Sequence, residues 1–219
     1  MPPALLFDMD GTLIDSDPLH AKVFIEFLGE LGVSITEEDY ISRYQGLRNE
    51  DIYRELFTEG DAAAFNDEKE ARYRKRLDEL PDLMPGTRAL LHRARADGAR
   101  TGCVTNACKE NLSAVFERFD LAPLFDFAIS ADDVSRPKPD PEIYLTAASS
   151  LSVAPEDCLV FEDSRSGLTA ARTAGATVVG LMSSLDADTL KAHGAHGAIR
   201  DFTDPALEPW LTNPQGTAA

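Results

Sequence analysis

The sequence has few cysteines and no long apolar run, and each shortage excludes a class of protein. Its three cysteines (Cys103, Cys108 and Cys158) are odd in number and lack Cys-x-x-Cys spacing, which argues against a disulfide framework and a zinc site. No apolar stretch approaches the length of a membrane span. The N-terminal apolar run has only four residues before it meets Asp8, too few for a signal peptide. We therefore expect a cytoplasmic protein without a membrane partner.

Positive charge is also scarce. The chain has 21 Lys and Arg against 38 Asp and Glu, so its formal net charge is −17. Nucleic acids and anionic membranes would be repelled, and we expect neither as a partner. An anionic substrate would need cations placed locally at its binding site. No repeat, low-complexity tract or exposed apolar face is evident in the sequence, which favours a monomer.

Strand patterns are missing from residues 16–80, where the apolar residues recur at helical spacing instead. The Asp17-Pro18 pair predicts the start of a first helix, which Gly32 ends. Thr36 is predicted to cap a second helix, and two more are expected over residues 49–57 and 66–80. Pro81 and Pro85-Gly86 mark a boundary. The sequence therefore predicts an all-helical domain at residues 16–80, inserted after the first strand.

The rest of the chain alternates between strand and helix patterns. Strands are predicted at residues 4–7, 100–104, 127–130, 158–161 and 177–181, and helices at 87–97, 109–119, 141–151 and 165–174. Such alternation favours a parallel sheet with helices on both faces. We therefore expect an α/β fold with a Rossmann-like three-layer core formed by residues 1–15 and 81–212. The small polar residues 213–219 are expected to form a frayed tail.

Four polar clusters stand at the ends of predicted strands or at the starts of the helices that follow. They are Asp8-Met9-Asp10-Gly11-Thr12, Thr105-Asn106, Lys138 and Glu162-Asp163-Ser164. Each has a plain alternative when taken alone: a solvated acidic turn, an ordinary turn, a surface lysine, or carboxylates that cap a helix. In a parallel sheet, however, the carboxyl ends of the strands meet at one edge, where such sheets bind ligands. Convergence at that edge favours a shared functional site.

The chemistry of the first cluster suits a cation and an anion together. Asp8 and Asp10 are like charges that favour a cation between them, or that separate into a base and an acid. Backbone N–H groups at Gly11 and Thr12 could bind an anion. In this order, the four clusters resemble the haloacid dehalogenase superfamily of phosphotransfer enzymes, in the branch of β-phosphoglucomutase and phosphoglycolate phosphatase. The resemblance covers nearly the whole chain, including a helical insertion of the type called a C1 cap.

The resemblance implies a role for each cluster. Asp8 would be the nucleophile that forms an aspartyl-phosphate, and Asp10 the general acid and then the base. A Mg²⁺ ion would be held by Asp8, the main-chain carbonyl of Asp10 and Asp163, with Glu162 acting through water. Charge on the phosphoryl group would be offset by Lys138, the Thr105 hydroxyl and nearby backbone N–H groups. For the backbone N–H groups, the resemblance implies substrate contacts at Gly11, Thr12, Asn106 and Ala107.

The reaction is narrowed by Asp10. A dehalogenase expels halide without an acid, and those relatives lack one at this position, so the acid favours an alkoxide leaving group. We therefore expect a phosphatase that acts on a small phosphorylated metabolite, a sugar phosphate or a phosphoglycolate-like acid. A sugar phosphomutase similar to β-phosphoglucomutase is the alternative. Mutases carry Gly-Val and a Ser-x-Ser loop, however, where this chain has Gly11-Thr12 and Thr105-Asn106-Ala107.

Specificity is expected to come from the helical insertion, since a cap closes over the site and excludes water. The candidate substrate residues are His20, Gly46, Arg48 and Asn49. Arg48 could bind a second anionic group through its bidentate fork, whereas mutases tend to carry arginine at the position of Asn49. His20 has an equally common alternative as a first-turn residue at the hinge. A non-catalytic phosphate-binding module would have lost Asp8, Asp10, Lys138 or Asp163, and none is lost.

Overall fold

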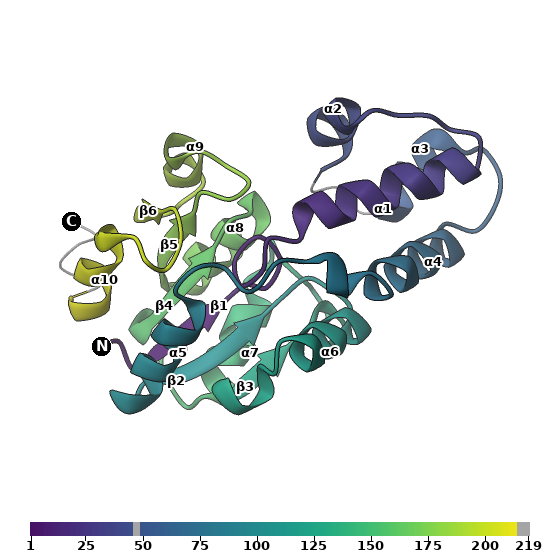
Figure 1. Cartoon of the computed structure of the whole chain (residues 1–219). Helices are drawn as coiled ribbons and strands as arrows, with labels where there is room; N and C mark the ends of the chain where they lie inside the picture. The colour runs from purple at the N-terminus through teal and green to yellow at the C-terminus, as the bar shows by residue number, and fades with distance from the viewer. Residues whose placement is uncertain (46–48, 214–219) are drawn as a thin grey trace. The chain divides into compact units, whose positions relative to one another are not determined.

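The computed structural model describes residues 1–45 and 49–213, and the chain divides into two compact units. Met1–Asp15 and Pro81–Ala219 make up the core unit, and Ser16–Leu80 make up the helical unit (Figure 1). Within the described residues, no helix is long and apolar enough to cross a membrane.

The core unit is built on one parallel six-stranded sheet. Its strands are β1 (Ala4–Phe7), β2 (Arg100–Val104), β3 (Phe127–Ile129), β4 (Cys158–Glu162), β5 (Thr177–Leu181) and β6 (Gly197–Ile199). Their order is β3-β2-β1-β4-β5-β6, with Leu5 paired to Thr101 on one side and to Leu159 on the other. The strand order therefore reverses direction at β1. In open α/β sheets, a ligand crevice forms at such a switch point, outside the carboxyl ends of the strands.

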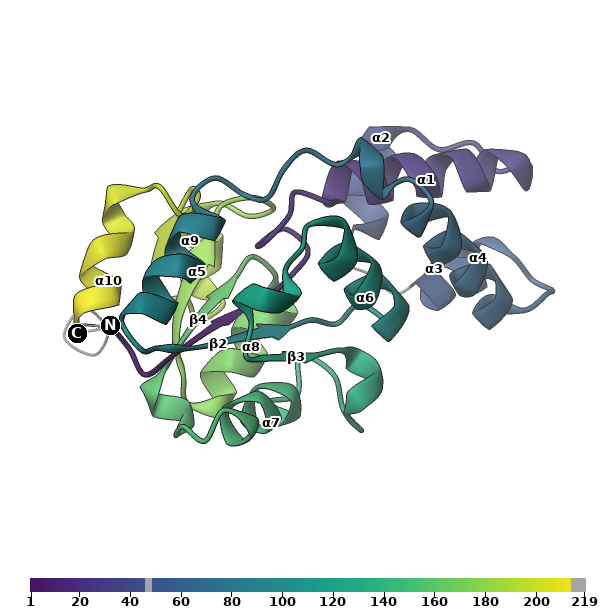
Figure 2. The same cartoon turned by 60° about the horizontal axis from the view of Figure 1, so that its bottom comes forward.

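Helices cover both faces of this sheet. α5 (Thr87–Ala96) and α6 (Lys109–Arg118) lie on one side, while α7 (Glu142–Ser150) and α8 (Arg165–Ala174) lie on the other (Figure 2). On the α7 and α8 side, Leu6, Val160 and Val178 pack against these helices and against α9 (Ala187–Ala192). On the opposite side, Phe7 stacks on Phe161 with ring centres 5.0 Å apart. Every β1 side chain is thus buried, as expected for a central parallel strand.

The helical unit has a small aromatic core. Its helices are α1 (Asp17–Glu30), α2 (Glu37–Asp39), α3 (Asn49–Leu56) and α4 (Ala62–Arg74), with a π-helical turn at Tyr40–Tyr44 and a 3₁₀ turn at Leu77–Glu79. Phe24, Phe27 and Phe65 pack together between these helices, and the rings of Phe27 and Phe65 stack 4.9 Å apart. Thr36 caps α2 through a reciprocal capping box with Asp39.

The predicted fold class is confirmed: an α/β core on a parallel sheet, with a helical insertion. The fourth helix differs from its predicted span of 66–80. It begins at Ala62, because the Asp61 side chain caps the N–H groups of Ala63 and Ala64, and it ends at Arg74, where the chain turns toward a 3₁₀ segment. The first helix begins at Asp17 itself, with Ser16 at its N-cap.

No element was predicted beyond residue 181, yet α9, β6 and α10 (Glu208–Thr212) follow there. These elements have three to six residues each, too few to display a periodic pattern. Of the predicted frayed tail, only Asn213 lies among the described residues, directly after α10.

Candidate active site

The turn that follows β1 carries the first pair of carboxylates. Asp8 is anchored by its backbone N–H, which donates to the carbonyl of Phe161 at 3.0 Å. The carbonyl of Met9 then accepts from three successive N–H groups, so that the chain closes into a tight turn. Gly11 has φ of +72° in this turn, and a Cβ there would come within 2.1 Å of the Asp163 carboxylate. Glycine is therefore required both by the backbone conformation and by the close approach of the metal-ligand candidate Asp163.

Lys138 lies at the centre of the cluster, with 2% of its side chain exposed. Its Nζ donates to Asp8 Oδ1 at 2.7 Å, to Glu162 Oε1 at 2.6 Å and to the carbonyl of Val104 at 2.7 Å. Burial lowers the pKa of Lys138, but attraction to the two carboxylates outweighs it and holds the pKa above its usual value. The lysine is therefore a fixed positive charge.

Burial raises the pKa of Asp8 well above its ordinary value, and Glu162 and Asp163 add to the effect while Lys138 opposes it. Two carboxylates thus contact the ammonium group of Lys138, and a third, that of Asp163, lies beside them. Asp8, Glu162 and Asp163 each offer an oxygen, and these oxygens lie within 4.8 Å of one another. An excess of negative charge and an all-oxygen donor set fit a hard divalent cation such as Mg²⁺.

Glu162 is wholly enclosed, and it is the last residue of β4 rather than the first residue after it. Oε1 accepts from the Tyr144 hydroxyl at 2.7 Å as well as from Lys138, and Oε2 accepts from the Ser164 hydroxyl at 3.1 Å. A Cβ at Gly167 would clash with this carboxylate, because the nearest oxygen would be only 1.8 Å away. Both oxygens of Glu162 therefore already accept protein donors, and Tyr144 was not among the predicted residues.

Asp163 is held by residues of two other segments. The Ser184 hydroxyl donates to its Oδ2 at 2.7 Å, and Thr12 Oγ1 lies 3.5 Å from its Oδ1. The neighbouring Ser183 donates to the carbonyl of Gly11 at 2.6 Å. Neither serine was predicted from the sequence, because the two form no recognised motif. They do follow β5, so the rule that strand ends converge could have found them.

The second and third predicted clusters are joined directly. Asn106 brackets the main chain of Lys138: its Nδ2 donates to the Lys138 carbonyl and its Oδ1 accepts from the Lys138 N–H, both at 3.0 Å. Thr105 is buried after β2, and its hydroxyl accepts from the Ala107 N–H at 2.9 Å. The turn after β2 is therefore closed by its own hydrogen bond, and Asn106 in this turn orients the loop that carries Lys138.

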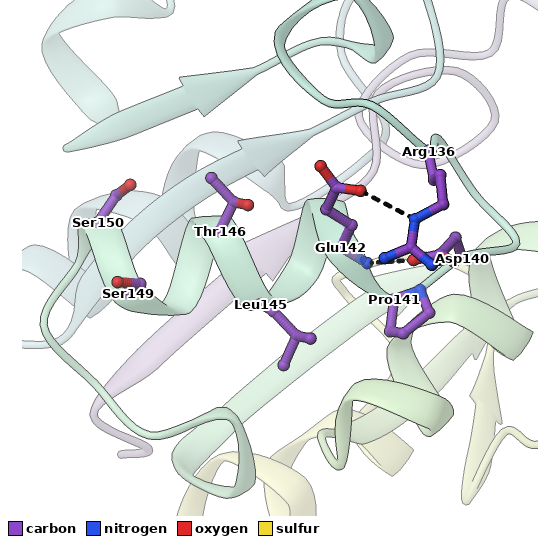
Figure 3. A pocket seen from close by; sticks show the side chains of 8 residues that line it. All are labelled: Arg136, Asp140, Pro141, Glu142, Leu145, Thr146, Ser149 and Ser150. Atoms are coloured by element: carbon purple, nitrogen blue, oxygen red, sulfur yellow. Dashed lines mark hydrogen bonds and ion pairs between the residues drawn. The ribbon is translucent and has the colours of Figure 1, made fainter.

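The outer side of the Lys138 loop faces a surface hollow along α7 (Figure 3). Arg136 reaches over its rim to Asp140 at 3.0 Å and to Glu142 at 3.3 Å. Glu142 also accepts from the Ser135 N–H, which ties the start of the loop to α7. None of the predicted catalytic residues lines this hollow, and its arginine is already paired, so it is not the candidate active site.

Two of the predicted specificity residues lie among the described parts of the helical unit. His20 Nδ1 is 2.6 Å from Lys69 Nζ, and its ring stacks on Tyr73 at 3.8 Å. Because an ammonium group can only donate, Nδ1 is the acceptor in this contact. Asn49 donates to Glu70 at 2.8 Å, and Glu70 in turn pairs with Lys69. His20 and Asn49 thus belong to one polar cluster. Gly46 and Arg48 lie outside the described residues.

Comparison with known proteins gives a consistent family. Residues 5–181 match the haloacid dehalogenase-like hydrolase family. A phosphorylated carbohydrates phosphatase from Thermotoga maritima is 32% identical over 203 residues, which cover 90% of this chain and 94% of the relative. The β-phosphoglucomutase of Bacillus subtilis is 28% identical over 216 residues, covering 94% of this chain and 92% of the relative.

A crystal structure of a haloacid dehalogenase hydrolase of family IA, variant 3, from Entamoeba histolytica superimposes with a TM-score of 0.85 and 30% identity. It covers 91% of this chain and 93% of that protein. The chain therefore belongs to the haloacid dehalogenase-like hydrolase family, which confirms the resemblance drawn from its motifs. A relative that is itself a phosphatase supports the prediction of a hydrolase of the phosphatase type.

Proposed function

We propose that this enzyme is a Mg²⁺-dependent phosphatase that hydrolyses a small phosphorylated metabolite, a sugar phosphate or a phosphoglycolate-like acid, through an aspartyl-phosphate. The observation that carries this proposal is the set of contacts around Asp8. Its carboxylate follows β1, Lys138 donates to it at 2.7 Å, and an oxygen of Asp163 lies within 4.8 Å. A buried carboxylate beside a fixed cation suits a nucleophile that attacks an anionic phosphoryl group.

Asp8 would attack phosphorus, and the bond from phosphorus to the leaving oxygen would break as Asp10 gives that oxygen a proton. A water molecule would then attack the aspartyl-phosphate, with Asp10 taking its proton, so that phosphate leaves and the Asp8 carboxylate is restored. Lys138 would offset the charge of the phosphoryl oxygens in both steps. The Thr105 hydroxyl and the backbone N–H groups around Met9 and Asn106 would hold those oxygens. The N–H groups of Gly11, Thr12 and Ala107, which were predicted to contact the substrate, donate instead within their own turns, to Ile14, Met9 and Thr105.

Mg²⁺ would be held by Asp8, the main-chain carbonyl of Asp10 and Asp163, with Glu162 acting through water. When bound, it supplies electrostatic stabilisation of the charge that develops on the phosphoryl group. The excess of carboxylates over ammonium groups in the cluster supports this part of the proposal.

The helical unit would recognise the rest of the substrate through His20, Asn49, Gly46 and Arg48. A carbohydrate substrate is supported by the phosphatase from Thermotoga maritima. The β-phosphoglucomutase relative supports a second candidate, a sugar phosphomutase. Thr12 and the Thr105-Asn106-Ala107 turn favour the phosphatase, since they depart from the mutase pattern. We also propose a monomer without nucleic-acid or membrane partners.

The test is release of inorganic phosphate with Mg²⁺ across sugar phosphates, phosphoglycolate and nucleotides. The panel includes β-glucose 1-phosphate primed with its bisphosphate. Fast release from one or a few substrates is expected. Accumulation of glucose 6-phosphate without phosphate release would assign the mutase instead. Asp8→Asn should abolish turnover, and normal turnover by that variant would rule out the covalent mechanism.

The role of Asp10 has its own test in the choice of leaving group. Asp10→Asn should lose most activity on an alkyl phosphate, whose alkoxide needs a proton, and least on an activated aryl phosphate. Equal losses on the two substrates would mean that Asp10 is not the acid.

A further inference from the structure

The segment that follows β5 contacts the candidate active site through two adjacent serines. Ser183 and Ser184 both donate hydrogen bonds there, but to different acceptors. The Ser183 hydroxyl donates to the backbone carbonyl of Gly11 at 2.6 Å, whereas the Ser184 hydroxyl donates to the side chain of Asp163 at 2.7 Å. Neither serine belongs to the four clusters found in the sequence, and the proposed reaction uses neither of them.

The Asp163 carboxylate is restrained on each side. Oδ2 accepts from Ser184, and it also lies so close to the α-carbon of Gly11 that a Cβ there would be 2.1 Å away. Oδ1 faces the Thr12 hydroxyl at 3.5 Å, a longer and weaker contact. The hydrogen bond from Ser184 is therefore shorter and stronger than the contact with Thr12.

A carboxylate in this position needs such a restraint. Asp163 and Asp8 are like charges, and an oxygen of each lies within 4.8 Å of the other. In the absence of a cation, repulsion favours rotation of the Asp163 side chain away from Asp8. A hydrogen bond to an ionised acceptor opposes that rotation, and groups that orient a metal ligand in this way typically change metal affinity by about 10–100-fold.

We infer that Ser184 is a positioning residue for divalent-cation binding, which acts by fixing the orientation of Asp163. This inference rests on the proposed function, in which Asp163 is a ligand of Mg²⁺. Ser183 fixes the same segment to the nucleophile turn through the carbonyl of Gly11 rather than through Asp163. The two serines thus form a matched pair, with the same hydroxyl, the same segment and different acceptors.

The experiment measures cation affinity rather than activity. Mn²⁺ is titrated into metal-free wild type, Ser184→Ala, Ser184→Thr and Ser183→Ala, with free Mn²⁺ followed by electron paramagnetic resonance and Mg²⁺ added as competitor. We expect Ser184→Ala to raise the Kd for Mn²⁺ by at least about tenfold. Ser184→Thr, which keeps the hydroxyl, and Ser183→Ala, which keeps Ser184, should each stay within about threefold of wild type.

If the role of Ser184 were merely structural, Ser184→Ala would have a lower Tm in EDTA than Ser183→Ala. We expect the two Tm values to match. Wild-type affinity in Ser184→Ala, or an equal loss in both alanine variants, would overturn the inference. A wild-type protein that binds no Mn²⁺ would overturn it together with the metal dependence. If wild type binds Mn²⁺ but releases no phosphate from any substrate, the proposed function fails, and the comparison of variants still decides the role of Ser184.

Discussion

The core unit and the helical unit each bury a lysine, and the two are neutralised differently. Lys138 in the core unit has 2% of its side chain exposed and donates to the carboxylates of Asp8 and Glu162. Lys69 in the helical unit has 4% exposed and contacts one carboxylate, that of Glu70, together with the imidazole of His20. Both lysines therefore satisfy the rule that a buried charge is paired.

The difference lies in the balance of charge. Asp8, Glu162 and Asp163 bring three carboxylates together beside Lys138, whereas Lys69 forms its ion pair with the single carboxylate of Glu70. An excess of buried negative charge costs stability unless a cation binds. The core unit thus offers a buried all-oxygen donor set that fits a cation, whereas the buried lysine of the helical unit contacts the polar side chains of Glu70 and His20.

Replacement of each lysine by methionine should separate the two roles most strongly. Lys138→Met should lower kcat at least about 100-fold, because it removes the fixed charge beside the nucleophile. It should also reduce the free energy of unfolding by about 3–5 kcal/mol, since two buried carboxylates lose their partner. Initial rates and urea unfolding measure both effects.

Lys69→Met serves as the control for that experiment. Glu70 retains its hydrogen bond from Asn49, so the expected loss of unfolding free energy is smaller, about 1–3 kcal/mol. Its kcat should change by less than about tenfold. If Lys69→Met lost as much activity as Lys138→Met without a loss of stability, the helical lysine would belong to the catalytic machinery and the contrast would be wrong.

Each unit also contains a glycine with positive φ, and the surroundings of the two glycines differ. Gly11 in the core unit (φ +72°) lies against Asp163, whereas a Cβ at Gly32 in the helical unit (φ +84°) would have nothing within 4 Å. Both alanine substitutions should cost about 1–2 kcal/mol of unfolding free energy from backbone strain. Only Gly11→Ala should also weaken Mn²⁺ binding, by at least about tenfold, because it displaces a ligand. Equal Mn²⁺ affinities in the two variants would contradict this account.

The excess negative charge predicts that the nucleophile destabilises the metal-free protein. Because the pKa of Asp8 is raised in the folded state, the folded protein binds more protons than the unfolded chain, and stability falls as the pH rises above the unfolded value near 3.8. In EDTA at neutral pH, Asp8→Asn should therefore raise Tm by about 2–4 °C. Saturating Mg²⁺ should shrink or reverse the difference. A lower Tm for Asp8→Asn in EDTA would refute the charge imbalance.

Exposed ion pairs should give the smallest effects and should not distinguish the units. Hydrogen bonds from Arg76 and Lys22 lower the pKa of Glu79 to about 2, and bonds from Arg93 lower the pKa of Glu208. For such depressed carboxyl groups, the stabilisation is present above the unfolded pKa near 4.5 and is lost as pH falls toward the folded value.

Glu79→Gln and Glu208→Gln should each flatten the fall of Tm below about pH 4.5 by a degree or two at most, and 1 M salt should screen the difference. Thermal unfolding at pH 7 and pH 3 provides the measurement. A large effect in one unit alone would show that its surface charges act as a network.

The predicted residues of the site that follow strands were accessible to sequence reasoning because parallel topology brings strand ends together. Asp8, Asp10, Thr105 and Asp163 could be placed at one edge without knowledge of any contact. Glu162 was predicted as well, as a residue that acts on the metal through water. Its enclosure by Tyr144, Ser164 and Lys138 could not be foreseen, since Tyr144 lies in the first turn of α7 among apolar residues and looks like a core residue.

The alternation of strands and helices, the helical insertion and the order of the candidate catalytic motifs could be predicted from the sequence. Hydrophobic periodicity and turn residues act over short stretches of chain, and so they are visible without the fold. Only the tertiary structure decided which donor serves which acceptor. Lys138 and Asp8 are 130 residues apart in the sequence, and Ser184 and Asp163 come from the ends of neighbouring strands. Side-chain pairing depends on packing between distant segments, and no local sequence pattern in one segment indicates its partner in another. The excess of buried negative charge therefore became visible only in the folded chain.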